Sequence, residues 1–499
     1  VISTRGQRKS AKAAVKDSNF TAPIGDQRRE AFNAQFPNRI AFKHAHSQQN
    51  PEQDWGRHVL QSIEFAFFVL RRMFPEHSIR RENTLVIASS VSNGGGASLR
   101  AAEQDTKGLI DGVVVSEPNV SPLFDDRFHI AQGNRAPVFA HSRSLCDYTT
   151  LLNVYQPCAN LDRAIAEAPF NSTPRILGEN ACASLSNNGL LRSTSLEAQA
   201  AEAQRIINDF GILPEQNLLQ PSHWFFYVPQ SLAVTYANAY GRFSVTDNPC
   251  GYSFGATDDN GDPAALDAAE EAALFAMSNG IPPTSGVNLI NDASQNGPKE
   301  NRVSISASAG RADQNLDGAL CLRALTVGRD PATGKELTDQ TLARHHRIAA
   351  GVEQIRATGD LHGIPTVIVN GRDDAILPPN FTSRAYFGRN QLIERGASNL
   401  RYYEVTNAHH LDMLNAYSGF DSRFIPLHYY FLEALDLMLA HLTKGAPLPP
   451  SQVIRTTPRG VDKSGKARNL NKENLPQILL EPGSDARITF ENNMVYIPE

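Results

Sequence analysis

Short apolar runs, separated by stretches of helical periodicity, set the pattern of this chain. The clearest runs lie at residues 85–88, 112–115, 364–369 and 400–405. Runs of this length, bounded by glycine or polar turns, are typical of strands buried in a parallel sheet. A further candidate strand lies at 39–42, and β-like pieces such as 487–490 occur near the end of the sequence.

Helical patterns accompany these strands. Residues 54–75 carry apolar side chains at helical spacing after Asp54, a candidate N-cap. Residues 97–103 follow the first apolar run as a helix, and residues 424–442 give the last strong helical pattern. Strands that alternate with helices predict an α/β fold with a mostly parallel sheet.

Between about residue 120 and residue 350 the alternation stops. This segment is rich in Ala, Asn, Pro and Gly, with helical stretches at 194–210, 264–279 and 338–357. A long insertion between two sheet strands is typical of a cap that supplies a substrate pocket. We therefore predict a first core part at 1–119, a cap at 120–355, a second core part at 356–445 and a C-terminal extension at 446–499 that packs on the core.

A glycine-rich turn separates the first apolar run from its helix. The sequence SVSNGGG at 90–96 follows a strand and precedes a helix, which is the setting of a nucleophile elbow. Such a turn holds one serine in a strained conformation, so the residues two before and two after it must be small. Centred on Ser92, these residues are Ser90 and Gly94, a relaxed form of G-x-S-x-G. The alternative is a glycine-rich turn that binds a phosphate.

Two later segments contain the partners that a serine nucleophile requires. The sequence GRDDAILP at 371–378 follows the third run, and NAHHLD at 407–412 follows the fourth. Serine, then acid, then histidine is the chain order of an α/β-hydrolase triad. In that triad the imidazole accepts the serine proton, and the carboxylate orients the imidazole.

Each partner has a competing neighbour. We favour Asp374 over Asp373, for which the alternative role is a turn residue that caps the next helix. We favour His410 over His409, and the alternatives for the pair are a surface loop or a metal site. Because two adjacent histidines point apart and a metal site needs more convergent ligands, we predict no bound metal.

Composition and charge disfavour several classes of protein. With 47 basic and 52 acidic residues among 499, the formal net charge is −5, which does not indicate nucleic acid or an anionic membrane as a partner. No apolar stretch is long enough to span a bilayer. The five cysteines allow one or two disulfides without requiring them. The sequence starts at Val1 without a signal-peptide pattern, and we expect a mature or truncated form.

Four longer runs indicate a family. They are FKHAHSQQNPE at 42–52, VSNGGGAS at 91–98, PRILGENAC at 174–182 and NAHHLD at 407–412. In these runs and along nearly its whole length, the sequence resembles the D-3-hydroxybutyrate oligomer hydrolases. The resemblance implies a serine esterase without a cofactor. Its substrates would be the 3-hydroxybutyrate dimers and short oligomers left when a depolymerase attacks poly(3-hydroxybutyrate).

The same resemblance assigns roles to residues. It implies that Ser92 is the nucleophile and that Asp374 and His410 complete the triad. The backbone N–H of Asn93, directly after the nucleophile, is the expected oxyanion-hole donor. Members of the family carry a region upstream of Val1, which we expect to hold early sheet strands and the second donor. An upstream segment of the same precursor is thus an expected partner.

Further expectations concern the substrate, rival functions and location. The product carboxylate is anionic, so Arg175 and Arg323 are candidate anchors, with solvated or structural ion pairs as the alternative. One rival is a tannase-like or feruloyl-esterase-like enzyme, but those enzymes place a cysteine beside the serine, and Val91 and Asn93 stand there. The other rival is a non-catalytic binding protein on the same fold. We expect a secreted or periplasmic protein, with the cytoplasm as the alternative.

Overall fold

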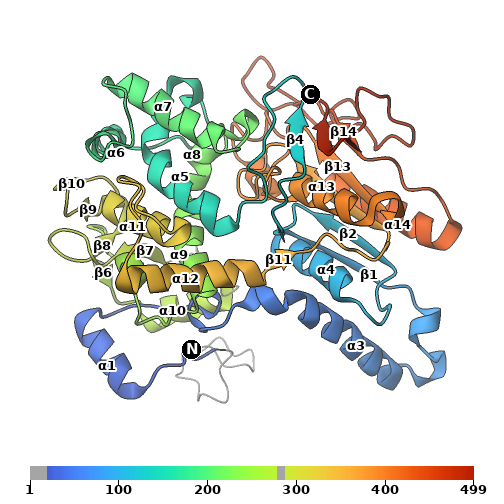
Figure 1. Cartoon of the computed structure of the whole chain (residues 1–499), viewed down its shortest axis with the longest axis horizontal. Helices are drawn as coiled ribbons and strands as arrows, with labels where there is room; N and C mark the ends of the chain where they lie inside the picture. Colours follow the sequence, from blue (N-terminus) through green and yellow to red (C-terminus); the bar gives the residue numbers. More distant parts are fainter. Residues whose placement is uncertain (1–19, 278–286) are drawn as a thin grey trace. The chain divides into compact units, whose positions relative to one another are not determined.

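The computed structural model describes residues 20–277 and 287–499 and has a mixed α/β architecture. The chain forms two compact units (Figure 1). Unit 1 comprises residues 1–51, 145–209 and 220–354, and unit 2 comprises residues 52–144, 210–219 and 355–499. The basic start of the sequence and the end of the helix expected at 264–279 lie outside the described residues.

A five-stranded parallel sheet forms the centre of unit 2, in the order β1-β2-β12-β13-β14. Its strands are β1 (Ile87–Val91), β2 (Gly112–Ser116), β12 (Thr366–Gly371), β13 (Leu400–Val405) and β14 (Gln452–Ile454). In register, Ser116 at the end of β2 pairs with Val91 of β1 and with Val369 of β12. The carboxyl ends of these neighbouring strands therefore meet at one edge of the sheet.

Helices cover both faces of this sheet because alternate strand residues point to opposite sides. On one face Val113 and Ile368 belong to a core shared with α4 (Ser92–Gln104) and α13 (Ser383–Glu394). On the other face Val114 and Val367 belong to a core shared with α14 (Leu427–Lys444). The helix α3 (Trp55–Met73) packs against α4, and Figure 1 shows α4 beside β1 and β2.

Smaller elements complete unit 2. The strand β3 (Ser121–Pro122) pairs in parallel with β11 (Arg356–Ala357). A three-stranded sheet joins β4 (His129–Gln132) to the chain end through β16 (Met494–Ile497) and β15 (Thr489–Glu491). The C-terminal segment is therefore a structural part of the unit that contains the parallel sheet.

Unit 1 is mainly helical. Its helices are α1 (Asp26–Gln35), α2 (Lys43–His46), α5 (Leu145–Ala159), α6 (Arg175–Asn187), α7 (Leu196–Asp209), α8 (Gln220–Phe225), α9 (Val228–Gly241), α10 (Ala268–Met277), α11 (Leu316–Val327) and α12 (Asp339–Gln354). The strands among its described residues are antiparallel: β5 (Tyr252–Thr257), β6 (Pro263–Ala264), β7 (Asn288–Asn291), β8 (Lys299–Glu300), β9 (Ile305–Ser306) and β10 (Arg311–Ala312).

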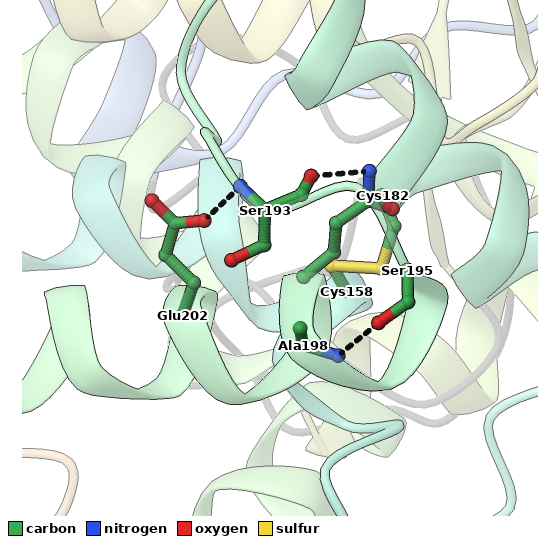
Figure 2. The surroundings of a disulfide bond; sticks show 7 residues. Cys158, Cys182, Ser193, Ser195, Ala198 and Glu202 are labelled. Carbon is green, nitrogen blue, oxygen red and sulfur yellow. Dashed lines mark hydrogen bonds between the residues drawn. A yellow bond between two sulfur atoms is a disulfide. The ribbon is translucent and has the colours of Figure 1, made fainter.

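Two disulfides cross-link unit 1. Cys158–Cys182 joins α5 to α6, and Cys250–Cys321 joins the turn before β5 to α11. Figure 2 shows the first of these beside the loop that leads into α7. In that loop the backbone N–H of Ser193 donates to the carboxylate of Glu202 at 2.8 Å. The fifth cysteine, Cys146, is a buried free thiol.

The apolar pattern predicted several of the observed elements. The strands expected at 112–115 and 400–405 and the helix expected at 54–75 are confirmed by β2, β13 and α3. The expected strand at 39–42 is wrong, because Arg39 makes only an isolated bridge to Gly255 and the chain turns into α2 directly afterwards. No helix within residues 20–277 and 287–499 is both long and apolar enough to cross a bilayer.

The predicted domain division and the two compact units differ in where they place some segments. Of the first core part predicted at 1–119, the described residues 20–51 are grouped with the helical unit 1. Residues 120–144, predicted with the cap, are grouped with the parallel sheet in unit 2. The four-part division into cores, cap and extension stays a prediction.

Candidate active site

Ser92 occupies the junction between the elbow strand and its helix. The strand β1 continues through Ser90 to Val91, and α4 begins at Ser92 itself rather than at the predicted position 97. The backbone of Ser92 has φ 53°, in the left-handed region that non-glycine residues rarely adopt. A strained serine between a strand and a helix is the backbone feature that the sequence motif predicted.

The glycines after Ser92 let the helix start close to its neighbours. A Cβ on Gly96 would lie 1.8 Å from the carbonyl oxygen of Asn119, and a Cβ on Gly94 would lie 2.1 Å from the hydroxyl oxygen of Ser90. The backbone N–H of Asn119 also donates to the carbonyl oxygen of Ser92 at 2.8 Å. The first turn of α4 is thus packed directly against the segment after β2.

His410 brings the two predicted partners of Ser92 together. Its Nε2 lies 2.9 Å from the hydroxyl oxygen of Ser92, and its Nδ1 lies 2.9 Å from Oδ2 of Asp374. The other carboxylate oxygen of Asp374 accepts the backbone N–H groups of Ile376 at 3.0 Å and Leu377 at 2.8 Å. Since this carboxylate only accepts, Nδ1 of His410 carries the proton, and in the neutral ring Nε2 is the acceptor for the serine hydroxyl.

The electrostatic environment of His410 favours its protonated form. Burial lowers the pKa of the imidazole, but the Asp374 carboxylate raises it by charge and hydrogen bonding. Glu117 and Asp412 raise it further through their charges, and the net direction is upward from 6.5. A general base must accept a proton readily, and these charges give the imidazole of His410 that property.

The neighbouring Asp373 has a different place. Its backbone N–H donates to the carbonyl oxygen of Ala408 at 3.0 Å, and its carboxyl group accepts the backbone N–H groups of Asn407 and Ala408. Burial raises the pKa of Asp373 to about 8. Asp373 therefore connects the loop after β12 to the loop that carries His410.

His409 is likewise directed elsewhere. Its Nε2 lies 2.9 Å from Oδ1 of Asn415, and its ring packs edge-on against Phe424. Burial lowers the pKa of His409, so the ring is held neutral inside the loop. The structure thus brings Asp374 and His410 to Ser92, and places Asp373 and His409 in the supporting loops.

A buried ion network lies under the acid loop. Arg372, two residues before Asp374, donates to Glu404 of β13 at 2.7 Å, and Arg384 of α13 donates to the same carboxylate at 2.7 Å. Burial raises the pKa of Glu404, but the two guanidinium groups outweigh it and lower the pKa to about 2. The loop that presents Asp374 is therefore fixed, through Glu404, to the strand β13 and the helix α13.

Comparison with known proteins agrees with the residue pattern. The 3HB-oligomer hydrolase family model matches residues 1–499. A relative from a Polaromonas species, named D-(-)-3-hydroxybutyrate oligomer hydrolase, is 44% identical over 99% of this chain and 70% of its own length. Relatives of the same name from Albidiferax ferrireducens, at 44%, and Paraburkholderia xenovorans, at 43%, also match 99% of this chain, covering 70% and 68% of their own lengths.

The chain belongs to the 3HB-oligomer hydrolase family. It is accordingly a member of a family of ester hydrolases, as the resemblance implied. Within the described ranges 20–277 and 287–499, the structure brings no three His, Cys, Asp or Glu side chains together as a metal-binding group.

The two arginines named as candidate substrate anchors both lie in unit 1. Arg175 pairs with Glu179 at 2.7 Å, one turn along an exposed face of α6. Arg323 pairs with Asp147 at 2.5 Å and also donates to the carbonyl oxygen of Asp147. Both are engaged in ion pairs within the unit, and their role toward a substrate stays a prediction.

The oxyanion-hole candidate and two residues outside the prediction lie at the sheet edge that carries Ser92. Asn93 is the second residue of α4, and its side-chain oxygen accepts from the amide of Asn119 at 2.8 Å. The prediction did not include Asn119 or Glu117, which follow β2 at the same sheet edge. Polar residues directly after a buried strand adjacent to the elbow strand are the signal that could have identified them.

Proposed function

We propose that this chain is a serine esterase that hydrolyses 3-hydroxybutyrate dimers and short oligomers to monomers. The family and the names of its relatives support the substrate class. The observation that carries the mechanism is the hydrogen-bonded series from Ser92 through His410 to Asp374. The strained backbone at Ser92 supports its role as the nucleophile of an α/β-hydrolase fold.

In the first step Ser92 attacks the ester carbonyl carbon. His410 accepts the serine proton at Nε2, while Asp374 holds the other ring nitrogen and stabilises the imidazolium. Negative charge develops on the carbonyl oxygen, and the backbone N–H of Asn93 is the proposed donor to it. When the carbon–oxygen ester bond breaks, His410 protonates the departing alkoxide, which leaves as a hydroxyl-terminated product.

In the second step water hydrolyses the acyl-enzyme. His410, neutral again, removes a proton from water as the hydroxide oxygen bonds to the acyl carbon. The serine oxygen then leaves and regains its proton from His410, and the second 3-hydroxybutyrate unit is released as a carboxylate. The sequence of bonds needs no redox change, which fits a mechanism that uses side chains alone.

Other features belong to the same proposal. We assign residues 120–355 to a cap that supplies the substrate pocket. We also propose that a depolymerase of poly(3-hydroxybutyrate) produces the oligomers that this chain hydrolyses. Arg175 and Arg323 remain candidates for holding the substrate carboxylate. A secreted or periplasmic location is supported by the two disulfides, because such bonds persist in oxidising compartments. A segment upstream of residue 1 remains the proposed source of the second oxyanion donor.

The test measures 3-hydroxybutyrate release from its D-dimer by the wild type, Ser92→Ala and Ser98→Ala. Ser98 lies in the same helix, and its hydroxyl donates to the carbonyl oxygen of Gly94 at 2.9 Å, so it controls for loss of a serine from α4. We expect Ser92→Ala to lose at least about 10³-fold in rate and Ser98→Ala to stay within about 10-fold. Equal rates for the wild type and Ser92→Ala would overturn the mechanism. Cleavage of p-nitrophenyl butyrate but not the dimer would overturn the substrate.

A further inference from the structure

Glu117 is a buried carboxyl group at the sheet edge that carries the triad. It follows directly after β2, and its backbone N–H donates to the carbonyl oxygen of Val369 in β12 at 2.8 Å. The residue is 7% exposed, and its backbone has φ 33°, an unusual value for glutamate. A strained backbone of this kind persists only where surrounding contacts hold it, and such residues cluster at functional sites.

The surroundings of Glu117 connect it to the proposed catalytic groups. The hydroxyl of Ser116 donates to its carboxylate. Three charged or titratable groups interact with it electrostatically: His410, Asp374 and Asp412. Burial raises the pKa of Glu117 to about 7, against the lowering effect of His410 and Ser116.

We propose that Glu117 is a positioning residue that acts through His410, because its negative charge favours the imidazolium and so sets the pH at which His410 becomes a free base. The inference rests on the proposed function, in which His410 must be neutral to accept the serine proton. Asp374 holds the ring by a hydrogen bond and Glu117 acts through charge. Asp412 also acts on His410 through its charge, and its carboxylate is held by the backbone N–H groups of Leu427 at 2.9 Å and His428 at 2.8 Å.

The sign of the effect follows from the charge. Replacing Glu117 by glutamine keeps the shape and removes the negative charge, so the protonated imidazole loses a stabilising partner. The pKa of His410 then falls, and the acid limb of the rate profile moves to lower pH. In the wild type Glu117 and His410 titrate as a coupled pair, so the acid limb belongs to both groups.

The experiment follows the pH dependence of two reactions in the wild type and Glu117→Gln. One is kcat/KM for p-nitrophenyl butyrate, whose acid limb reports the base of the free enzyme. The other is the rate at which phenylmethanesulfonyl fluoride modifies Ser92, followed by intact mass. We expect both acid limbs to move down by about one pH unit in Glu117→Gln. An unmoved acid limb in folded Glu117→Gln overturns the proposal.

Two further variants keep the test specific. Asp105→Asn is the matched control, because Asp105 is a buried carboxylate near the other end of β2 that accepts the backbone N–H groups of Lys107 and Ile110. It should lower stability without moving either limb, and an equal movement would overturn the proposal. Ser116→Ala removes the hydrogen-bond donor to Glu117, so Glu117 is less often charged and the acid limb should move in the same direction by less. This variant tests the proposal if Glu117→Gln does not fold. Sulfonylation that persists in Ser92→Ala would overturn the proposed function instead.

Discussion

Nε2 of His410 lies 2.9 Å from the hydroxyl oxygen of Ser92, although 318 residues separate them in the sequence. The parallel register of the sheet explains this approach. Ser92 follows β1 and His410 follows β13, and all parallel strands present their carboxyl ends at one edge. The hydrogen bond therefore depends on the strand order as much as on the local loops.

The first prediction separates the two adjacent aspartates. Asp374→Asn should lower kcat by about 10³- to 10⁴-fold with the fold retained, because an amide no longer favours the required tautomer or the imidazolium. Asp373→Asn should stay within about 10-fold, since Asp373 bonds to the backbone of the His410 loop rather than to the imidazole. Both are measured as kcat on the D-dimer beside thermal unfolding. A larger loss of kcat in Asp373→Asn would reverse the assignment of the acid.

The second prediction separates the two histidines. His410→Gln should remove activity because no imidazole then accepts the Ser92 proton. His409→Gln should lower the free energy of unfolding by about 1–2 kcal/mol, since the ring packs on Phe424 and bonds to Asn415. Chemical unfolding and single-turnover rates on p-nitrophenyl butyrate distinguish these outcomes. Full activity in His410→Gln would contradict the proposed base.

Much of the fold and of the candidate site could be read from local sequence. The apolar runs identified four of the five strands of the parallel sheet, because strands buried on both faces need continuous apolar residues, but no run predicted β14. The favoured pair Asp374 and His410 lies next to Ser92 as the motif order predicted, while the catalytic role of the three stays a proposal. Their neighbours could not be excluded from sequence, since one position along a loop reverses the direction of a side chain.

Long-range pairing set the limits of that reading. The run at 39–42 has the composition of a strand, yet the backbone N–H of Ile40 reaches only Phe254 and the next turn is helical. Glu117 and Asn119 were missed because their importance comes from pairing β2 beside β1, which the sequence does not specify. The helix α3 was predicted, but Phe65 and Phe68 on it are exposed, so periodicity did not reveal which face is covered.

The third prediction concerns the packing of the elbow. Gly94→Ala should lose stability and activity, because its Cβ would meet the side chain of Ser90. Adding Ser90→Gly removes both atoms that obstruct this Cβ, so the double variant should recover most of the loss. Gly96→Ala meets the backbone of Asn119 instead and should resist rescue by Ser90→Gly. The midpoint of thermal unfolding and kcat are measured for Gly94→Ala and Gly96→Ala, each with and without Ser90→Gly. Rescue of both alanine variants by Ser90→Gly would contradict the prediction.

The fourth prediction concerns the disulfides of unit 1. They close loops with sequence separations of 24 and 71 residues. Loop-closure entropy gives each a contribution of about 3–5 kcal/mol. Replacing Cys158 and Cys182 together by serine should therefore lower the midpoint of unfolding, and dithiothreitol should lower it further by acting on Cys250–Cys321. The buried thiol Cys146, replaced by Ala, is the control, and a dithiothreitol-insensitive midpoint would contradict the prediction.

The last prediction concerns acid unfolding of unit 1. Burial lowers the pKa of His44 and of His46 to about 4 from 6.5, so both rings are neutral in the folded unit. The unfolded chain binds these protons first as the pH falls. The free energy of unfolding is therefore at its full value above about pH 6.5. It falls progressively down to about pH 4, by on the order of 3 kcal/mol for each ring.

Urea unfolding between pH 4 and pH 7.5 tests the prediction in a Trp55→Phe background, where the buried Trp224 reports on unit 1. His46→Asn should flatten the pH dependence, because it removes a titrating ring. The amide oxygen can still accept the backbone N–H of Phe42 that Nδ1 accepts at 2.9 Å, so the fold should be kept. His346→Asn, at an exposed position of α12 in the same unit, should leave the slope unchanged. Equal slopes in the wild type and His46→Asn would show that the buried ring does not govern acid unfolding.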